Sequence, residues 1–210
     1  MKTRRTRVPA ALRATVFALL ISGAVLHLSR AAADEAAPAA EHLAGSWQKH
    51  QFSFAFMGFT STYSCDGLAD KLRVLLLAAG ARADVKSQPG ACASPYGRPD
   101  KFARADLTFY TLAPLAGDAA ANDKPVDGVW RPVALAALSP WQLQIGDCEV
   151  VDQFRTQVLP MFTTRGIENH TTCVPHQESG SLIDLKFQAL AAAPVKKDAA
   201  SAKSAAGAGS

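Results

Sequence analysis

The residues best placed to do chemistry lie between positions 170 and 176, where His170, Cys173 and His176 follow one another at intervals of three. Imidazole and thiolate groups at this spacing can ligate zinc. A zinc site needs further ligands, and a disulfide competes for Cys173, one of four cysteines in the chain. We therefore predict no metal and no other cofactor, and keep His170 and His176 as candidates for a binding surface.

Carboxylates and hydroxyls provide weaker signals for catalysis. Asp66 and Asp70 lie one helical turn apart and resemble an acid–base pair only superficially, because a helix cap and a surface ion pair explain both. Residues 163–165 (Thr-Thr-Arg) could hold an anion. The sequence contains no nucleophile elbow, zinc-protease motif or phosphate-binding loop. It favours a non-enzymatic protein, with a hydrolase whose site is assembled from two halves of the chain as the alternative.

Residues 1–33 have the composition of a secretory signal: a basic start, an apolar stretch from Ala14 to Leu28, and three alanines before Asp34. The stretch is shorter than the ~20 apolar residues of a membrane-spanning helix. We predict cleavage near Asp34, with an uncleaved anchor as the alternative. Removing the signal takes away six of the 22 basic residues and none of the 18 acidic ones, which leaves 16 − 18 = −2. The prediction is a periplasmic or secreted bacterial protein with no nucleic-acid partner and no stable membrane insertion.

The chain between the signal and the C-terminus reads as two similar units. Three residue pairs share a separation of 83 positions: Gly45 and Gly128, Trp47 and Trp130, Cys65 and Cys148. We therefore predict a duplicated architecture. Its parts are a linker over 34–44, a first unit over 45–114, a connecting loop over 115–127, a second unit over 128–190, and a disordered Ala/Lys/Ser tail over 191–210.

Each unit has a β-α-β-β pattern. Alternating Phe52, Phe54 and Phe56 predict a strand over 50–59, with its counterpart over 130–138. The helix that follows begins at Ser64 or Asp66 and ends at Gly80 in the first unit; in the second it begins at Asp147 and has Pro160 in its last turn. Further strands are expected near 82–87, 104–113, 163–171 and 181–190.

Two such units predict an α+β fold. Its sheet is mixed or antiparallel with both helices on one face, or else two small sheets meet at a pseudo-twofold axis. The absence of a glycine-rich turn between strand and helix argues against a dinucleotide-binding fold.

Four cysteines in an exported chain predict two disulfides. In a strand-helix-strand unit with parallel strands, the start of the helix lies at the end of the sheet where the second strand finishes. This geometry pairs Cys65 with Cys92 and Cys148 with Cys173, although pairings between the units also satisfy the repeat. Without closely spaced thiols, a structural role is favoured over a redox role.

The predicted binding surface includes three aromatic residues outside the clearest core stripes: Tyr63, Tyr96 and Trp141. Arg165 of the possible anion site and the histidines His170 and His176 complete it. We expect the partner, an envelope protein or a small ligand, to bind at the junction of the two units.

Three segments resemble an uncharacterised family of exported proteobacterial proteins. They are the run that starts Tyr63-Ser-Cys-Asp-Gly-Leu-Ala-Asp-Lys, Cys148-Glu-Val-Val, and Phe162-Thr-Thr-Arg165, and the resemblance covers most of residues 47–190. It implies export to the periplasm and no particular substrate.

Overall fold

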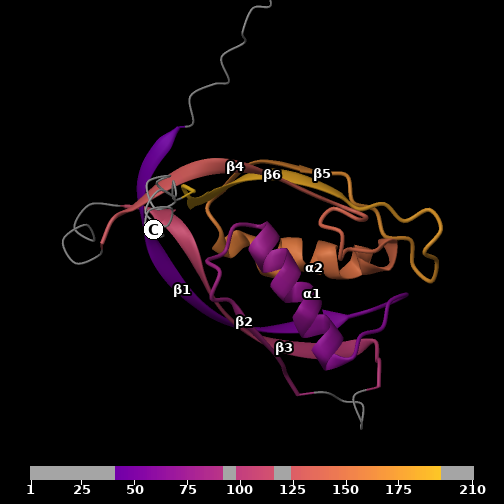
Figure 1. Ribbon diagram of the computed structural model, residues 1–210. Coiled ribbons are helices and arrows are strands. Elements are labelled where there is room, and N and C mark those ends of the chain that lie inside the picture. The colour runs from indigo at the N-terminus through magenta and orange to yellow at the C-terminus, as the bar shows by residue number, and fades with distance from the viewer. Residues whose placement is uncertain (1–40, 92–97, 116–123, 195–210) are drawn as a thin grey trace, which may run out of the picture. The chain divides into compact units, whose positions relative to one another are not determined.

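The computed structural model describes residues 41–91, 98–115 and 124–194, and its central element is one six-stranded sheet. The strand order is β2-β3-β1-β4-β6-β5, and every neighbouring pair is antiparallel. The strands are β1 (His42–Met57), β2 (Lys86–Pro89), β3 (Phe102–Pro114), β4 (Val126–Ala136), β5 (Thr164–Asn169) and β6 (Asp184–Ala192). The sheet curves around two helices, α1 (Cys65–Ala78) and α2 (Cys148–Gln157) (Figure 1). The predicted α+β class is confirmed, in its single-sheet antiparallel form.

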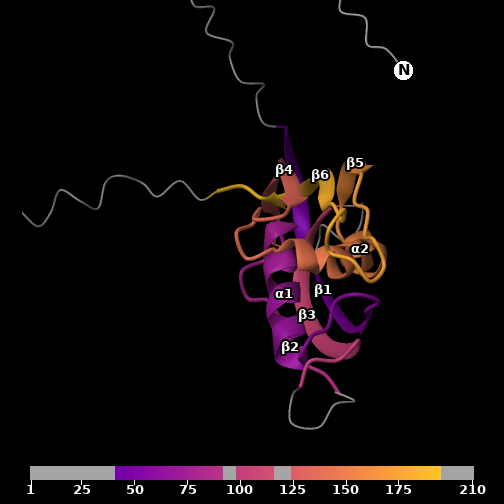
Figure 2. The ribbon, with the colours of Figure 1, turned by 90° about the vertical axis from the view of Figure 1, so that its right-hand side faces the viewer.

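The two halves of the sheet have the same chain path. The elements from β1 to β3 give the order β2-β3-β1, and those from β4 to β6 give the order β5-β6-β4. Within each half, the strands before and after the helix run in the same direction on either side of a third strand. The halves join where β1 and β4 pair, from His42 opposite Val129 to Gly45 opposite Val126. Strands β4, β6 and β5 lie above α2 in both views (Figure 2).

Helix α1 begins and ends where the sequence predicts. The Ser64 side chain accepts a hydrogen bond from the backbone N–H of Gly67, which satisfies a donor left free at the start of the helix. Gly80 follows the helix with a φ of +98°, a left-handed conformation that glycine adopts without strain. Leu68, Leu72, Leu75 and Leu76 form the apolar stripe, and each is fully buried against the sheet.

Helix α2 begins where the sequence predicts but ends earlier. It follows a short 3₁₀ turn, Ile145–Asp147, and Asp147 occupies the predicted N-cap position. Its carboxylate makes no capping bond to α2, because it is bonded to Tyr63, Lys71 and the backbone N–H of Gln144. Pro160 lies beyond the α-helix and not in its last turn, in a second 3₁₀ turn over Leu159–Met161.

One hydrophobic core fills the space between the sheet and the helices. Phe54 and Phe56 of β1 point into it at period two, as predicted, and Phe154 of α2 packs in the same cluster. Because an alternating strand buries one face only, Ser53, Ala55 and Met57, which alternate with these two phenylalanines, are exposed. No helix in the described part of the chain is long and apolar enough to cross a membrane.

Several predictions fall on residues outside the described ranges. They concern the signal over 1–33, the linker before residue 41, Cys92, Tyr96, most of the connecting loop, and the tail beyond residue 194. Strand β1 begins at His42, within the predicted linker, and β4 begins at Val126, within the predicted connecting loop. Strand β6 continues to Ala192, two residues past the predicted unit.

The opposite face of the sheet carries two similar arginine–tryptophan stacks. The Arg82 guanidinium lies 5.6 Å from the centre of the Trp47 ring, and the Arg165 guanidinium lies 4.2 Å from that of Trp130. Trp47 is paired across the sheet with Leu112, and Trp130 with Leu190. Both leucines are buried although neither belongs to the main core. They form a second small apolar cluster beside the β1–β4 junction.

Candidate binding surface at the loop end

Three segments from both halves meet where β1, β4 and β5 finish. They are the turn over residues 58–64, the loop over 137–147 and the loop over 170–183, and we call this region the loop end. The Ser61 hydroxyl donates to the backbone carbonyl of Gly146, and the Thr60 hydroxyl donates to that of Val174 at 3.3 Å. These hydrogen bonds connect the first half directly to both loops of the second half.

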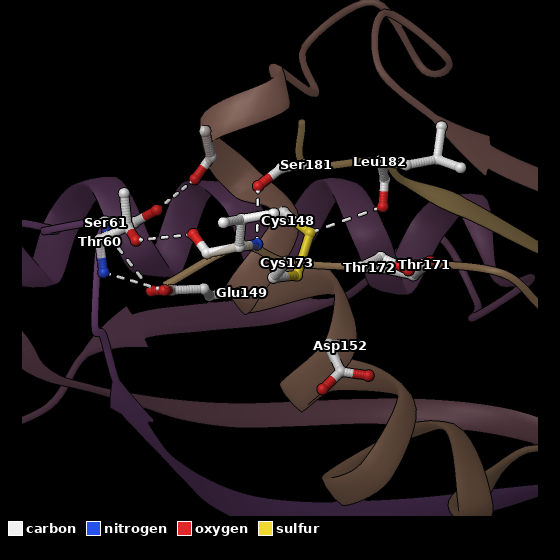
Figure 3. Close-up of a disulfide and its surroundings, with 12 residues drawn as sticks. Thr60, Ser61, Cys148, Glu149, Asp152, Thr171, Thr172, Cys173, Ser181 and Leu182 are labelled. Carbon is white, nitrogen blue, oxygen red and sulfur yellow. Dashed lines mark hydrogen bonds between the residues drawn. A yellow bond between two sulfur atoms is a disulfide. The ribbon is translucent and has the colours of Figure 1, made fainter. Parts of the chain in front are cut away.

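A disulfide between Cys148 and Cys173 holds the start of α2 to the loop over 170–183 (Figure 3). Their Cα atoms are 5.7 Å apart, and this predicted pairing is confirmed. The strand-helix-strand geometry on which the prediction rests is also present, because β4 and β5 run in the same direction and α2 lies between them in the chain. The other predicted bridge involves Cys92, which lies outside the described ranges; none of the described cysteines is a free thiol.

Glu149, next to the disulfide, anchors the turn that follows β1. Its carboxylate accepts hydrogen bonds from three consecutive backbone N–H groups, those of Phe59 at 3.0 Å, Thr60 at 2.9 Å and Ser61 at 3.2 Å. Figure 3 shows Glu149 beside Thr60 and Ser61. Glu149 is buried, so these bonds satisfy a charge that has little access to water. Sequence reasoning did not identify this residue.

Two glutamines extend the same contact along α2. The side chain of Gln153 binds both the N–H and the carbonyl of Met57, at 3.1 and 2.7 Å, and Gln157 donates to the Ala55 carbonyl at 3.4 Å. Beyond Gly45, β1 pairs with β3 on one side only, so these backbone groups lie on its other, unpaired edge. Residues 149, 153 and 157 are four apart, the spacing of one helix face, which is the signal that could have revealed this stripe.

A buried polar cluster links the start of α2 to α1. The Tyr63 hydroxyl donates to Asp147 at 2.5 Å, the ammonium of Lys71 lies 2.6 Å from the same carboxylate, and the backbone N–H of Gln144 donates to it at 2.7 Å. Burial and the nearby carboxylates of Asp147 and Glu149 raise the pKa of Tyr63. Tyr63 is only 9% exposed, so its predicted place on an accessible surface is wrong.

A groove of about 490 Å³ opens beside this framework and is lined by both halves. Met57 and Phe59 of the first half contribute apolar side chains that are 57% and 62% exposed. Glu149, Asp152, Gln153, Cys173 and Pro175 of the second half complete the lining. The Asp152 carboxylate points away from the disulfide and pairs with Arg155 at 2.9 Å (Figure 3). The groove is thus largely apolar, with a disulfide at one side.

The loop over 137–147 presents the most exposed aromatic side chain of the described structure. Trp141 is 75% exposed and Leu138 is 66% exposed. Between them and the helix, Leu143 is fully buried, and the Lys71 ammonium donates to the carbonyl of Gln142. Trp141 therefore projects from a loop that is fixed by its neighbours, and its predicted place at the surface agrees with the structure.

The remaining predicted surface residues lie on the second half. Arg165, on β5, is stacked on Trp130 and binds Gln188 at 2.7 Å and Glu41 at 2.8 Å, so its guanidinium is already bonded within the chain. His170 and His176 are exposed on the loop over 170–183. With Cys173 in a disulfide, the zinc interpretation of this motif has no support, and the described residues contain no group of three or more His, Cys, Asp or Glu arranged to hold a metal.

One histidine–hydroxyl pair invites a catalytic interpretation. His50 Nε2 lies 2.8 Å from Thr111 Oγ1, but that hydroxyl donates its hydrogen to the Met161 carbonyl at 3.0 Å. His50 must therefore donate to Thr111, which is the reverse of what a general base does. Burial also lowers the pKa of His50 and favours its neutral form. The pair fixes side chains in place and does not activate Thr111.

Comparison of the chain with protein-family models, with curated proteins and with solved structures finds no match.

Proposed function

We propose that this protein is an exported binding module of the bacterial envelope that accepts an apolar group of a partner protein or small ligand at its loop end. The groove carries this proposal, because Met57 and Phe59 remain more than half exposed there although both are large and apolar. Exposed apolar side chains grouped at a groove are typical of binding sites. The groove is also lined by residues of both halves, and the sequence predicts that the partner binds at their junction.

The framework behind the groove supports a binding role. Glu149 holds the backbone of residues 59–61, and Gln153 holds that of Met57, so the apolar side chains project from a fixed backbone. A preorganised surface loses less conformational entropy when it binds. Export is supported by the Cys148–Cys173 disulfide, because such bonds persist in oxidising compartments.

The polar groups of the loop end favour binding over hydrolysis. The Asp147 carboxylate is bonded to Tyr63, Lys71 and Gln144, and that of Glu149 is bonded to three amides. Carboxylates with this many internal donors act as anchors of the backbone rather than as acids or bases.

Titration of the mature protein with the neutral apolar dye N-phenyl-1-naphthylamine tests the groove. We expect Phe59→Ser to weaken dye binding about tenfold or more, because it removes a large apolar contact. Ile167→Ser, which changes an exposed apolar residue on β5, is the matched control and should bind as the unaltered protein does. Equal dye binding by all three proteins would refute the groove as a binding site.

We also infer that the two halves arose from one duplicated unit. Both arginine–tryptophan stacks obey the separation of 83 residues, since Trp47 and Arg82 correspond to Trp130 and Arg165. The β1–β4 pairing shows the same separation. Gly45 is paired with Val126, and the residues 83 positions away from these two, Gly128 and Leu43, are also paired with each other. This register is what two identical strands would form across a twofold axis through the Ala44–Asp127 pair.

A further inference from the structure

The loop end, taken together with the adjoining parts of α1, α2, β5 and β6, differs in charge from the rest of the mature chain. These wider segments, residues 58–73, 137–155 and 168–186, contain eight acidic and four basic side chains, a net charge of −4. The whole chain after the signal has 18 acidic and 16 basic residues, so everything outside these segments carries +2. The same segments carry the exposed apolar side chains of Phe59, Leu138 and Trp141.

Most of the basic groups at the loop end are already paired. Lys71 lies 2.6 Å from Asp147, Arg155 lies 2.9 Å from Asp152, and Lys186 lies 3.0 Å from Asp184. Five carboxylates of these segments make no ion pair with another described residue: Asp66, Asp70, Glu149, Glu168 and Glu178. Glu149 is buried and bonded to backbone N–H groups, and the other four are exposed.

Unpaired carboxylates lie on two elements that contact the loop carrying Trp141. Helix α1 contacts it through Lys71, whose ammonium binds the carbonyl of Gln142, the residue after Trp141, and the exposed Asp70 precedes Lys71 on this helix. The Glu178 carboxylate lies 3.1 Å from where a Cβ on Gly146 would be placed, which puts it against the other end of the same loop. Asp66 lies one turn before Asp70 on the same exposed face of α1. Glu178 thus places unpaired negative charge against one end of the loop, and α1, which contacts its middle through Lys71, carries two more unpaired carboxylates.

We propose that the loop end binds a cationic polypeptide segment, with Lys or Arg side chains at Asp66, Asp70 and Glu178 and an apolar side chain against Trp141 and Leu138. This inference rests on the proposed binding function and specifies its partner. An exposed Trp on a fixed loop is a typical interface anchor. Complementary charge accelerates association and selects the partner. An anionic lipid surface or wall polymer carries the same sign of charge as the loop end and is repelled by it.

The test uses the mature protein and three probes. They are a short synthetic peptide of alternating lysine and leucine, the same peptide with glutamate in place of lysine, and vesicles of mixed phosphatidylcholine and phosphatidylglycerol. We expect the lysine peptide to bind, with an affinity that falls as salt concentration rises. The glutamate peptide and the vesicles should not bind.

Two matched double variants separate specific recognition from overall charge. Asp66→Asn/Asp70→Asn removes two carboxylates from the part of α1 that adjoins the loop end, and Asp106→Asn/Asp127→Asn removes two from β3 and β4. We expect the first to weaken binding of the lysine peptide about tenfold, and the second to change it less than about twofold. Equal effects of the two variants, or tighter binding of the vesicles or the glutamate peptide, would overturn the cationic partner.

Trp141→Ala distinguishes failure of this inference from failure of the proposed function. If Trp141→Ala abolishes binding while the two double variants behave alike, the loop end binds through its apolar residues and the charge argument is wrong. If Phe59→Ser leaves dye binding unchanged and Trp141→Ala leaves peptide binding unchanged, the proposed binding function itself fails.

Discussion

The first turns of α1 and α2 place equivalent acidic residues in opposite environments. Asp66 and Glu149 are separated by the same 83 positions as the tryptophans. Asp66 is exposed and makes no ion pair with a described residue, whereas Glu149 is buried and accepts three backbone hydrogen bonds. The difference arises because the turn after β1 crosses over to the second half. The two halves share the order of their strands and helix, whereas the contacts of Glu149 with residues 59–61 have no counterpart at Asp66 and occur only at the loop end.

The strongest test of this comparison is to truncate both acidic residues. Glu149→Ala leaves three backbone donors of residues 59–61 without their acceptor, and we expect it to lower the free energy of unfolding by about 3 kcal/mol. Asp66→Ala should cost less than about 0.5 kcal/mol, because it removes an exposed side chain. Urea denaturation measures both, and equal costs would contradict the asymmetry.

Substitutions at Gly45 and Gly128 test what the halves share. A Cβ on Gly128 would lie 2.8 Å from a Leu112 methyl group and 2.9 Å from the Leu43 carbonyl oxygen, and one on Gly45 would lie 2.8 Å from the Ala113 carbonyl oxygen. We expect Gly128→Ala and Gly45→Ala each to destabilise the fold by about 1–3 kcal/mol through overpacking. Thermal unfolding measures the effect. A neutral result at either glycine would show that the two halves do not depend on the same close approach.

Tyr63→Phe tests the bond between the halves and has a pH signature. At neutral pH we expect a loss of about 1–2 kcal/mol, because Asp147 loses one donor. The folded-state pKa of Tyr63 is raised, so its stabilising effect is complete below the unfolded pKa of about 10 and is lost as pH rises above it.

Urea denaturation across this pH range provides the readout. The unaltered protein should lose stability above about pH 10 more steeply than Tyr63→Phe. Tyr110→Phe, which alters the ring stacked with Arg82, is the control and should retain the steep loss. Parallel pH profiles for Tyr63→Phe and the unaltered protein would contradict the assignment.

The smallest effects are expected at the arginine–tryptophan stacks. Arg82→Ala removes cation–π contacts with Trp47 and Tyr110, and Arg165→Ala removes one with Trp130; each variant should cost about 0.5–1 kcal/mol. Their effects should add in the double variant, because the stacks lie in different halves. A large effect at one arginine and none at the other would argue against equivalent roles for the two stacks and against the proposed duplication.

Local signals predicted the parts of the fold that depend on neighbouring residues. The Ser64 cap and Gly80 bound α1 because capping and left-handed glycine act within a few residues. Phe54 and Phe56 mark the buried face of β1 because strand periodicity is written in the sequence. The Cys148–Cys173 bridge followed from the order of strand, helix and strand in one half.

The surface residues were predicted less well, because solvent exposure depends on the whole fold. Trp141 is exposed as expected, but Tyr63 is buried, and its hydroxyl donates to a carboxylate 84 positions away in the chain. Asp147 looked like a helix cap by its position alone, and its distant partners Tyr63 and Lys71 take that carboxylate instead.

By itself, the sequence of this protein predicted the approximate places of the helices and strands and the Cys148–Cys173 pairing, since these depend on residue type, local spacing and the order of elements in one half. Only the tertiary structure decided that Glu149, Gln153 and Gln157 hold the turn after β1 and its unpaired edge. Those contacts join residues about 90 to 100 positions apart. The way the two halves pack decides which distant backbone groups these side chains contact, and no local sequence pattern indicates those groups.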